Sequence, residues 1–134
     1  AFDTFTQQGY RLRDVEGYMT KGGLRYAALW DKGGNGKFVA RHGMSGQAYQ
    51  SRFDQYTSNG YRLTHVDGYW TPKGVRYVAI WEKAGNGAFV ARHGMTGSSY
   101  QTAFDNYVGQ GYALKHVSGY WDGSQIRYAA IWNR

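Results

Sequence analysis

Residues 60–70 read GYRLTHVDGYW, and this phrase decides the fold because the chain contains it in three versions. It appears as GYRLRDVEGYM at 9–19 and as GYALKHVSGYW at 111–121. Around it, residues 6–56 and 57–107 align without a gap and are identical at 31 of 51 positions. Repetition at a fixed long period is typical of architectures in which each unit buries its apolar face against its neighbours. The sequence therefore predicts two or three similar surfaces rather than one asymmetric centre.

The 134 residues are predicted to form a single repeat domain, 1–134, which is long enough to bury a compact core. The repeat phase divides it into a partial repeat at 1–5, full repeats at 6–56 and 57–107, and a partial repeat at 108–134.

Composition excludes several classes of function. The net charge is +7, but the basic residues are spread along the chain without a basic run. This pattern favours anionic partners in general and argues against dedicated nucleic-acid binding. The absence of cysteine excludes disulfides and thiol chemistry. No apolar run is long enough for a membrane span.

One helix is predicted in each repeat. Tyr100, Phe104 and Tyr107 are spaced by four and seven residues, which places them on one helical face. Thr96 precedes this stretch as an N-cap, and Gly111 follows it where a C-terminal glycine belongs. The predicted helices cover 45–58 and 96–108, with a truncated one at 1–8.

Strands are predicted in the rest of each repeat. Residues 61–70 are rich in β-formers, and their apolar positions slip out of alternation in a way that predicts a bulge near Thr64–His65. After a turn, residues 75–82 are apolar on both faces, as in a central strand. Asn86-Gly87 predicts a tight hairpin that returns the chain at 89–92. We therefore expect an α+β fold of three tandem helix-plus-antiparallel-meander repeats, arranged with pseudo-threefold symmetry and with curved, half-barrel-like sheets.

The C-terminal end carries a structural consequence. In this scheme the third repeat stops before its last strand, so the strand that ends at Arg134 lacks its in-register partner. Unpaired edges invite pairing. We expect either that another repeat covers this edge or that a second chain pairs with it, which would make a homo-oligomer through the C-terminal strand edge.

No catalytic or metal-binding motif stands out. The chain has neither a Gly-x-Ser-x-Gly elbow nor a Ser-x-x-Lys motif, and its carboxylates, such as Asp54 and Asp105, fall at repeat-equivalent positions. The four histidines, at 42, 65, 93 and 116, show no metal-ligand spacing. The sequence predicts no enzyme, no metal and no cofactor; a hydrolase is kept as a third class of function.

Aromatic and arginine side chains are the binding candidates. If Tyr69 points inward, strand alternation turns Trp70 outward beside the hairpin turn. Exposed rings beside turns can stack on sugar rings or partner side chains, and arginines can add planar donors. The competing interpretation of the Arg-Tyr pairs is a structural stack or ion pair at the sheet rim. The candidate ligand-binding residues are Trp70, Trp121, Met19, Arg25, Arg76, Arg127, Arg41, Arg92, His42 and His93.

The phrases GYRLTHVDGYW, RYVAIWEK and FVARHGM resemble the bacterial tandem repeat family. In that family, similar repeats precede the β-lactamase-like catalytic domain of polyglycine-hydrolase-type serine hydrolases. The catalytic Ser-x-x-Lys of those enzymes lies in the other domain. The resemblance therefore implies a secreted, non-catalytic repeat module.

The function expected from these observations is lectin-like binding of glycans at two or three quasi-equivalent sites. The alternative is a protein-binding or substrate-recruiting accessory module of a secreted hydrolase, with an extracellular protein as partner and an open strand edge for main-chain pairing. The identity of the ligand and the number of working sites stay open.

Overall fold

The computed structural model describes residues 11–20, 23–31, 38–83 and 88–134, with side chains described in the last two ranges. The predicted helix at 1–8 and the Asn86-Gly87 turn lie outside the described residues. In chain order the elements are β1 (Arg11–Thr20), β2 (Gly23–Asp31), β3 (Phe38–Met44), α2 (Gly46–Ser58), β4 (Arg62–Thr71), β5 (Gly74–Glu82), β6 (Phe89–Met95), α3 (Gly97–Gly109), β7 (Ala113–Trp121) and β8 (Ile126–Asn133).

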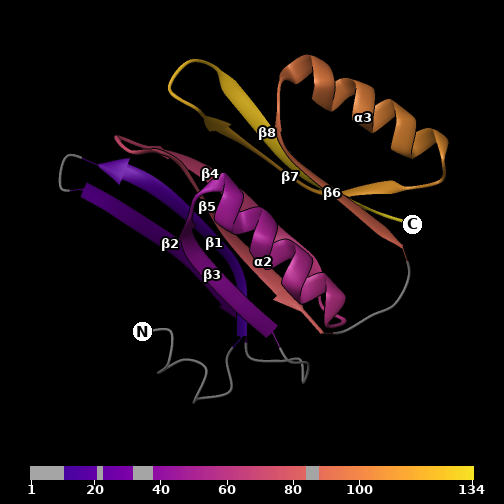
Figure 1. The fold of residues 1–134 in the computed structure, drawn as a ribbon, viewed down its shortest axis with the longest axis horizontal. Helices are drawn as coiled ribbons and strands as arrows, with labels where there is room; N and C mark the ends of the chain where they lie inside the picture. Colours follow the sequence, from indigo (N-terminus) through magenta and orange to yellow (C-terminus); the bar gives the residue numbers. More distant parts are fainter. Residues whose placement is uncertain (1–10, 21–22, 32–37, 84–87) are drawn as a thin grey trace.

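The strands form three antiparallel sheets, and the α+β class is confirmed. The first sheet pairs β1 with β2, the second has the order β3-β5-β4, and the third has the order β6-β8-β7. Figure 1 shows α2 lying across the second sheet and α3 across the third. We call the face of a sheet that carries its helix the inner face, and the opposite one the outer face. The pseudo-threefold arrangement and the half-barrel curvature stay predictions.

The predicted meander is wrong in its third strand. The central strand β5 pairs with β4 and with β3, the strand that precedes the helix, so that Val39 lies opposite Trp81. Strand β6 pairs instead with β8, with Phe89 opposite Asn133. A strand has only two edges, and both edges of β5 are occupied within its own sheet. The unit is therefore strand–helix–hairpin, and the chain moves on to the next sheet after β5.

Of the two alternatives for the C-terminal strand, the structure shows the first, since a strand of the preceding repeat covers its edge. Strand β8 is the centre of the third sheet, with β7 on one side and β6 on the other. The pairing continues to the end of the chain, where the backbone nitrogen of Arg134 donates to the carbonyl of Ala88 at 3.0 Å. The FVARHGM strand β6 thus fills the edge for which pairing with a second chain was the other alternative.

The predicted bulge and helix caps are confirmed. The register between β4 and β5 shifts between Leu63 and His65. As a result Leu63 and Val66 both reach the same buried core, despite their odd spacing. The Thr96 hydroxyl accepts from the backbone nitrogen of Ser99 at 3.1 Å, which caps α3. Gly111, after the helix, has a φ of +92°, a conformation that favours glycine.

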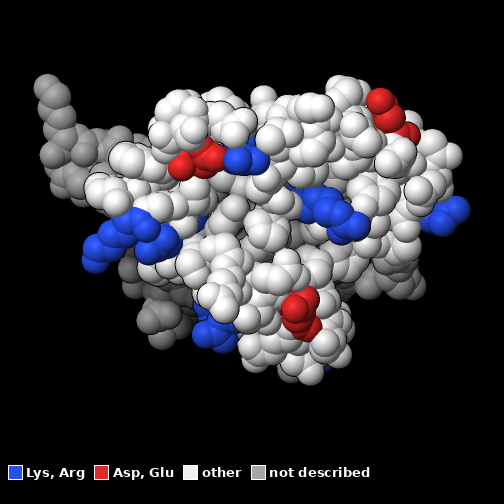
Figure 2. Space-filling view, turned by 45° about the horizontal axis from the view of Figure 1, so that its top comes forward, with Lys and Arg blue, Asp and Glu red and all other residues white. Residues whose placement is uncertain are grey.

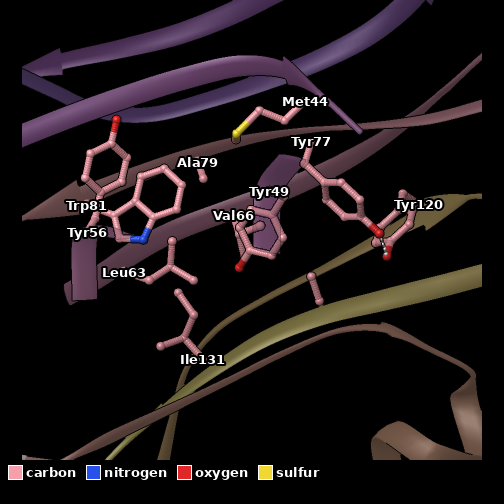
Figure 3. Packing of buried hydrophobic residues seen from close by; sticks show 11 residues of the cluster. Met44, Tyr49, Tyr56, Leu63, Val66, Tyr77, Ala79, Trp81, Tyr120 and Ile131 are labelled. Atoms are coloured by element: carbon pink, nitrogen blue, oxygen red, sulfur yellow. Dashed lines mark hydrogen bonds between the residues drawn. The ribbon is translucent and has the colours of Figure 1, made fainter. Parts of the chain in front are cut away.

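The main core lies between the second and third sheets. The inner face of the second sheet supplies Leu63, Val66 and Trp81, while Ala129 and Ile131 come from the outer face of the third sheet. Figure 3 shows the Trp81 indole beside Leu63, with Ile131 approaching from the neighbouring sheet. Helix α2 therefore covers part of the inner face of the second sheet, and the third sheet covers the remainder. No helix among the described residues is long and apolar enough to cross a membrane.

Candidate functional site

The tryptophans at the hairpin ends are exposed, as alternation predicts. Tyr69 is buried, and its hydroxyl accepts from the backbone nitrogen of Gly43 at 3.1 Å. The next side chain, Trp70, is 39% exposed at the end of β4, and its counterpart Trp121 is 47% exposed at the end of β7. Both rings thus remain accessible to a ligand or to a protein partner.

Four residues at these hairpin ends form a cluster that joins two repeats: Trp70, Asp122, Gly123 and Arg127. We call this cluster the hairpin ridge. Arg127 Nε donates to Asp122 Oδ2 at 2.7 Å. Gly123 lies against the indole of Trp70, so closely that a Cβ there would be 2.7 Å from Nε1. Trp70 therefore lies across a repeat junction against the β7–β8 turn, in which the neighbouring Asp122 binds Arg127. Asp122 was missed because the equivalent position in the second repeat is Thr71.

Asp122 is held as a carboxylate. The hydrogen bond from Arg127 lowers its pKa to about 2, and the backbone nitrogens of Gln125 and Ser124 contribute further hydrogen bonds. The Arg127–Asp122 pair matches the alternative interpretation, an ion pair at the sheet rim.

The other described arginines do not gather around the tryptophans. The Arg41 guanidinium lies 5.9 Å from the centre of the Tyr56 ring, and that of Arg92 lies 5.6 Å from the centre of the Tyr107 ring. Arg76 donates through Nη1 to the carbonyl of its neighbour Val75. Arg41 and Arg92 thus stack on tyrosines of the helices that follow their strands, which is a structural use of these side chains.

A groove of about 480 Å³ runs between α2 and β6, and we call it the junction groove. Its helix side is α2, which packs on the second sheet, and its strand side is β6 of the third sheet, so neither sheet with its helix contains it alone. Its volume falls within the range of small-molecule sites. It is lined by Tyr49, Gln50, Phe53, Thr57, Phe89, Val90, Ala91, Arg92 and His93.

His93 is the most distinctive polar residue of the junction groove. Its ring lies edge-on to Tyr49, with centroids 4.8 Å apart, and edge-on to Tyr77 at 5.4 Å. Burial lowers the pKa of His93, so the imidazole is neutral at pH 7 and offers one donor and one acceptor. Burial also raises the pKa of Tyr49 and Tyr77, which keeps both hydroxyls protonated. His42, the counterpart on β3, is exposed.

The remaining predicted positions lie elsewhere. Met19 is opposite Leu24 and Arg25 is opposite Tyr18 at the end of the β1–β2 hairpin, and their side chains lie outside the described part. Among the described side chains, no group of three or more His, Asp and Glu residues is placed to hold a metal ion. Figure 2 shows lysines and arginines separated over one face, with acidic residues between them, rather than joined in a patch.

Two other histidines meet at the junction without forming such a group. The rings of His65 and His116 lie 4.4 Å apart, and His116 Nε2 is 2.7 Å from the carbonyl oxygen of Val66. These side chains join β4 to β7 and so contribute to the contact between repeats.

Comparison with known protein families agrees with this architecture. A family model described as polyglycine hydrolase-like, structural repeat, matches residues 1–33, 35–84 and 86–134, and the chain belongs to this family. The second and third matches each contain one strand–helix–hairpin unit. Each repeat of the family model therefore coincides with one three-stranded sheet and its helix. No curated protein sequence matches the chain.

Proposed function

We propose that this chain is a non-enzymatic carbohydrate-binding module and that the junction groove is its sugar site. The observation that carries the proposal is the composition of the groove: aromatic side chains form one part of its wall, and a neutral imidazole and an amide form another. A pyranose ring presents apolar C–H faces and a rim of hydroxyl groups, and it therefore requires both kinds of surface.

The aromatic wall comes from both sides of the groove. Phe53 on α2 and Phe89 on β6 lie with centroids 6.2 Å apart, and both rings are partly exposed. The guanidinium of Arg62 lies 5.4 Å from the centre of the Phe89 ring. Partly exposed rings give the C–H faces of a sugar an apolar surface to stack on.

The polar groups are held in place by other contacts. Gln50 Nε2 donates to Asp54 Oδ1 at 3.0 Å, which orients the amide. His93 is oriented by the two tyrosine rings, Tyr49 and Tyr77, that it meets edge-on. Groups that are already oriented lose less conformational entropy when they bind, which favours binding at a shallow site.

Because the groove needs two successive repeats, the number of sites follows the number of junctions. The predicted pseudo-threefold arrangement would place two or three such sites on one molecule. Weak sites of this kind gain avidity when the target is itself repetitive, as extracellular polysaccharides are. An extracellular glycan is therefore the proposed ligand, in line with a secreted module.

The test is binding of the purified chain to an array of immobilised glycans, followed by titration of the best ligand. We expect His93→Ala to weaken binding about tenfold, which corresponds to about 1.4 kcal/mol, because a hydrogen-bonding group of the groove is lost. Ser51→Ala, at an exposed position of α2 outside the lining of the groove, is the control.

Two outcomes would contradict the proposal. One is an array without any bound glycan. The other is a ligand whose affinity falls with Trp70→Ala and not with His93→Ala, which would assign binding to the hairpin ridge instead. Thermal unfolding of each variant separates lost binding from lost folding.

A further inference from the structure

The third sheet exposes an apolar surface that the glycan site does not use. Val117, Trp121 and Ile126 are three of the largest exposed hydrophobic residues in the described part, at 42%, 47% and 46% exposure. Alternation along β7 and β8 places all three on the same face as Trp132, which packs with α3. They therefore form the part of the inner face that α3 leaves open, and we call it the uncovered face.

The second sheet shows what covers such a face. Val66, the counterpart of Val117, is only 1% exposed, because the outer face of the third sheet packs against it through the cluster that includes Tyr120 and Ile131. The difference between Val66 and Val117 thus comes from the presence of a following sheet and not from the valine itself.

Polar and steric features of that junction are repeated on the uncovered face. At the junction the hydroxyls of Tyr77 and Tyr120 are 2.8 Å apart, a bond that Figure 3 marks. The Tyr120 ring also lies so close to Gly68 that a Cβ there would be 2.7 Å from it. The counterparts of Tyr77 and Gly68 on the third sheet are Tyr128 and Gly119, and Gly119 is exposed. At Gly119 the third sheet thus has a position without a side chain, on which a tyrosine ring of another sheet can lie.

We propose that the uncovered face binds the outer face of another repeat of this kind, supplied by the first sheet of a second copy of the chain. Within one molecule the outer faces of the second and third sheets are already buried, as Tyr69, Ile80 and Ala129 show. The β1–β2 sheet is the remaining sheet of the same kind. At the sequence positions equivalent to Tyr120, Ala129 and Ile131 it carries Tyr18, Ala27 and Leu29.

The proposed contact is head-to-tail, because it joins the last sheet of one molecule to the first sheet of the next. Such a contact uses two different surfaces and generates either a ring or an open assembly. It is a packing of faces, and it differs from the strand-edge pairing that β6 already satisfies.

Sedimentation velocity over a range from micromolar to millimolar concentration tests this proposal. We expect the average mass of the unmodified chain to rise with concentration. Val117→Lys should weaken association at least about tenfold, because it places a charge in an apolar contact. Ile126→Lys, on the neighbouring strand β8, should also weaken association. The matched control is Ser51→Lys, which adds the same charge at an exposed position of α2.

A chain that stays monomeric over this range would overturn the proposal. So would association that Val117→Lys and Ile126→Lys leave unchanged, or that Ser51→Lys weakens equally. Because Val117 and Ile126 are exposed in the single molecule, both variants should unfold at the temperature of the unmodified monomer, and circular dichroism checks this. Glycan binding is measured on the same variants and should persist, which separates this proposal from that of the sugar site.

Discussion

Gly68 is one of the residues at which two repeats contact each other closely. It is buried on β4, and the Tyr120 ring of the next sheet occupies the space where a side chain would project. Its φ is not in the left-handed region, so the requirement for glycine is steric and comes from the neighbouring repeat. The recurrence of glycine at this position in the phrase GYRLTHVDGYW therefore has a packing explanation.

Gly68→Ala is expected to destabilise the chain by about 1–3 kcal/mol, the usual cost of overpacking a well-packed contact. The new Cβ would lie 2.7 Å from the Tyr120 ring and would push it from its place beside Tyr77. Denaturant unfolding measures the change. Gly119→Ala, at the exposed counterpart, is the control and should cost less, since its nearest contact is 3.3 Å. Equal costs at the two positions would contradict this explanation.

Among the elements, the β7–β8 hairpin depends on one half-buried carboxylate, that of Asp122. Asp122 accepts from two backbone nitrogens of the turn, those of Ser124 and Gln125, and from the side chain of Arg127. In the β4–β5 hairpin the hydroxyl of Thr71 has the corresponding role, accepting from Lys73 and donating to Gly74. Two different side chains thus close equivalent turns by local hydrogen bonding.

The carboxylate makes the hairpin sensitive to acid. The folded pKa of Asp122, about 2, lies below the usual value of about 3.9, so the charge stabilises the folded state above pH 4 and this contribution is lost as the pH falls towards 2. Asp122→Asn should therefore lower the melting temperature at neutral pH and flatten its decline in acid. Asp105→Asn, on the exposed side of α3, is the matched control. An unchanged acid profile in Asp122→Asn would refute this role.

At the scale of the whole molecule, the sheets differ in how completely they are covered. The second sheet has neighbours on both faces: its outer face holds a buried cluster of Tyr69, Val78 and Ile80, and its inner face packs on the third sheet. The third sheet has a covered outer face, and in the described part of the chain its inner face is covered by α3 alone. Two units of the same architecture therefore stand in different environments.

This difference predicts a gradient of local stability. Amide hydrogen exchange should be slower in β4 and β5 than at the equivalent positions of β7 and β8, because opening the second sheet disrupts two interfaces. The measurement is made at low protein concentration, where self-association is minimal. Equal protection of Val66 and Val117, or slower exchange at Val117, would contradict the prediction.

Local features could be predicted from the sequence, and the pairing of strands could not. The bulge at Leu63–His65, the cap at Thr96 and the exposure of Trp70 depend on a few neighbouring residues, and all three are confirmed. The third strand of the second sheet is set by whether β5 pairs with β3 or with β6. Both strands have the same sequence, FVARHGM, so no local pattern distinguishes them. The Asn86-Gly87 turn signal favoured the wrong one.

The same limitation applies to the candidate site. The candidate rings and arginines follow from patterns within one repeat, whereas the junction groove combines α2 with a strand of the next sheet. One signal was present in the sequence: Phe89, Ala91 and His93 alternate along β6 and so share a face. That face meets the preceding helix, a relation that becomes visible only when the strand order is known.

Because the outer face of the third sheet fits the inner face of the second, repeated units carry the two surfaces of one contact. A gene for such a chain can lengthen or shorten by duplication or deletion of whole units without any new contact having to evolve. A change of length that is not a whole unit would instead leave mismatched surfaces next to each other. Selection should therefore favour insertions and deletions of one complete strand–helix–hairpin unit at a time.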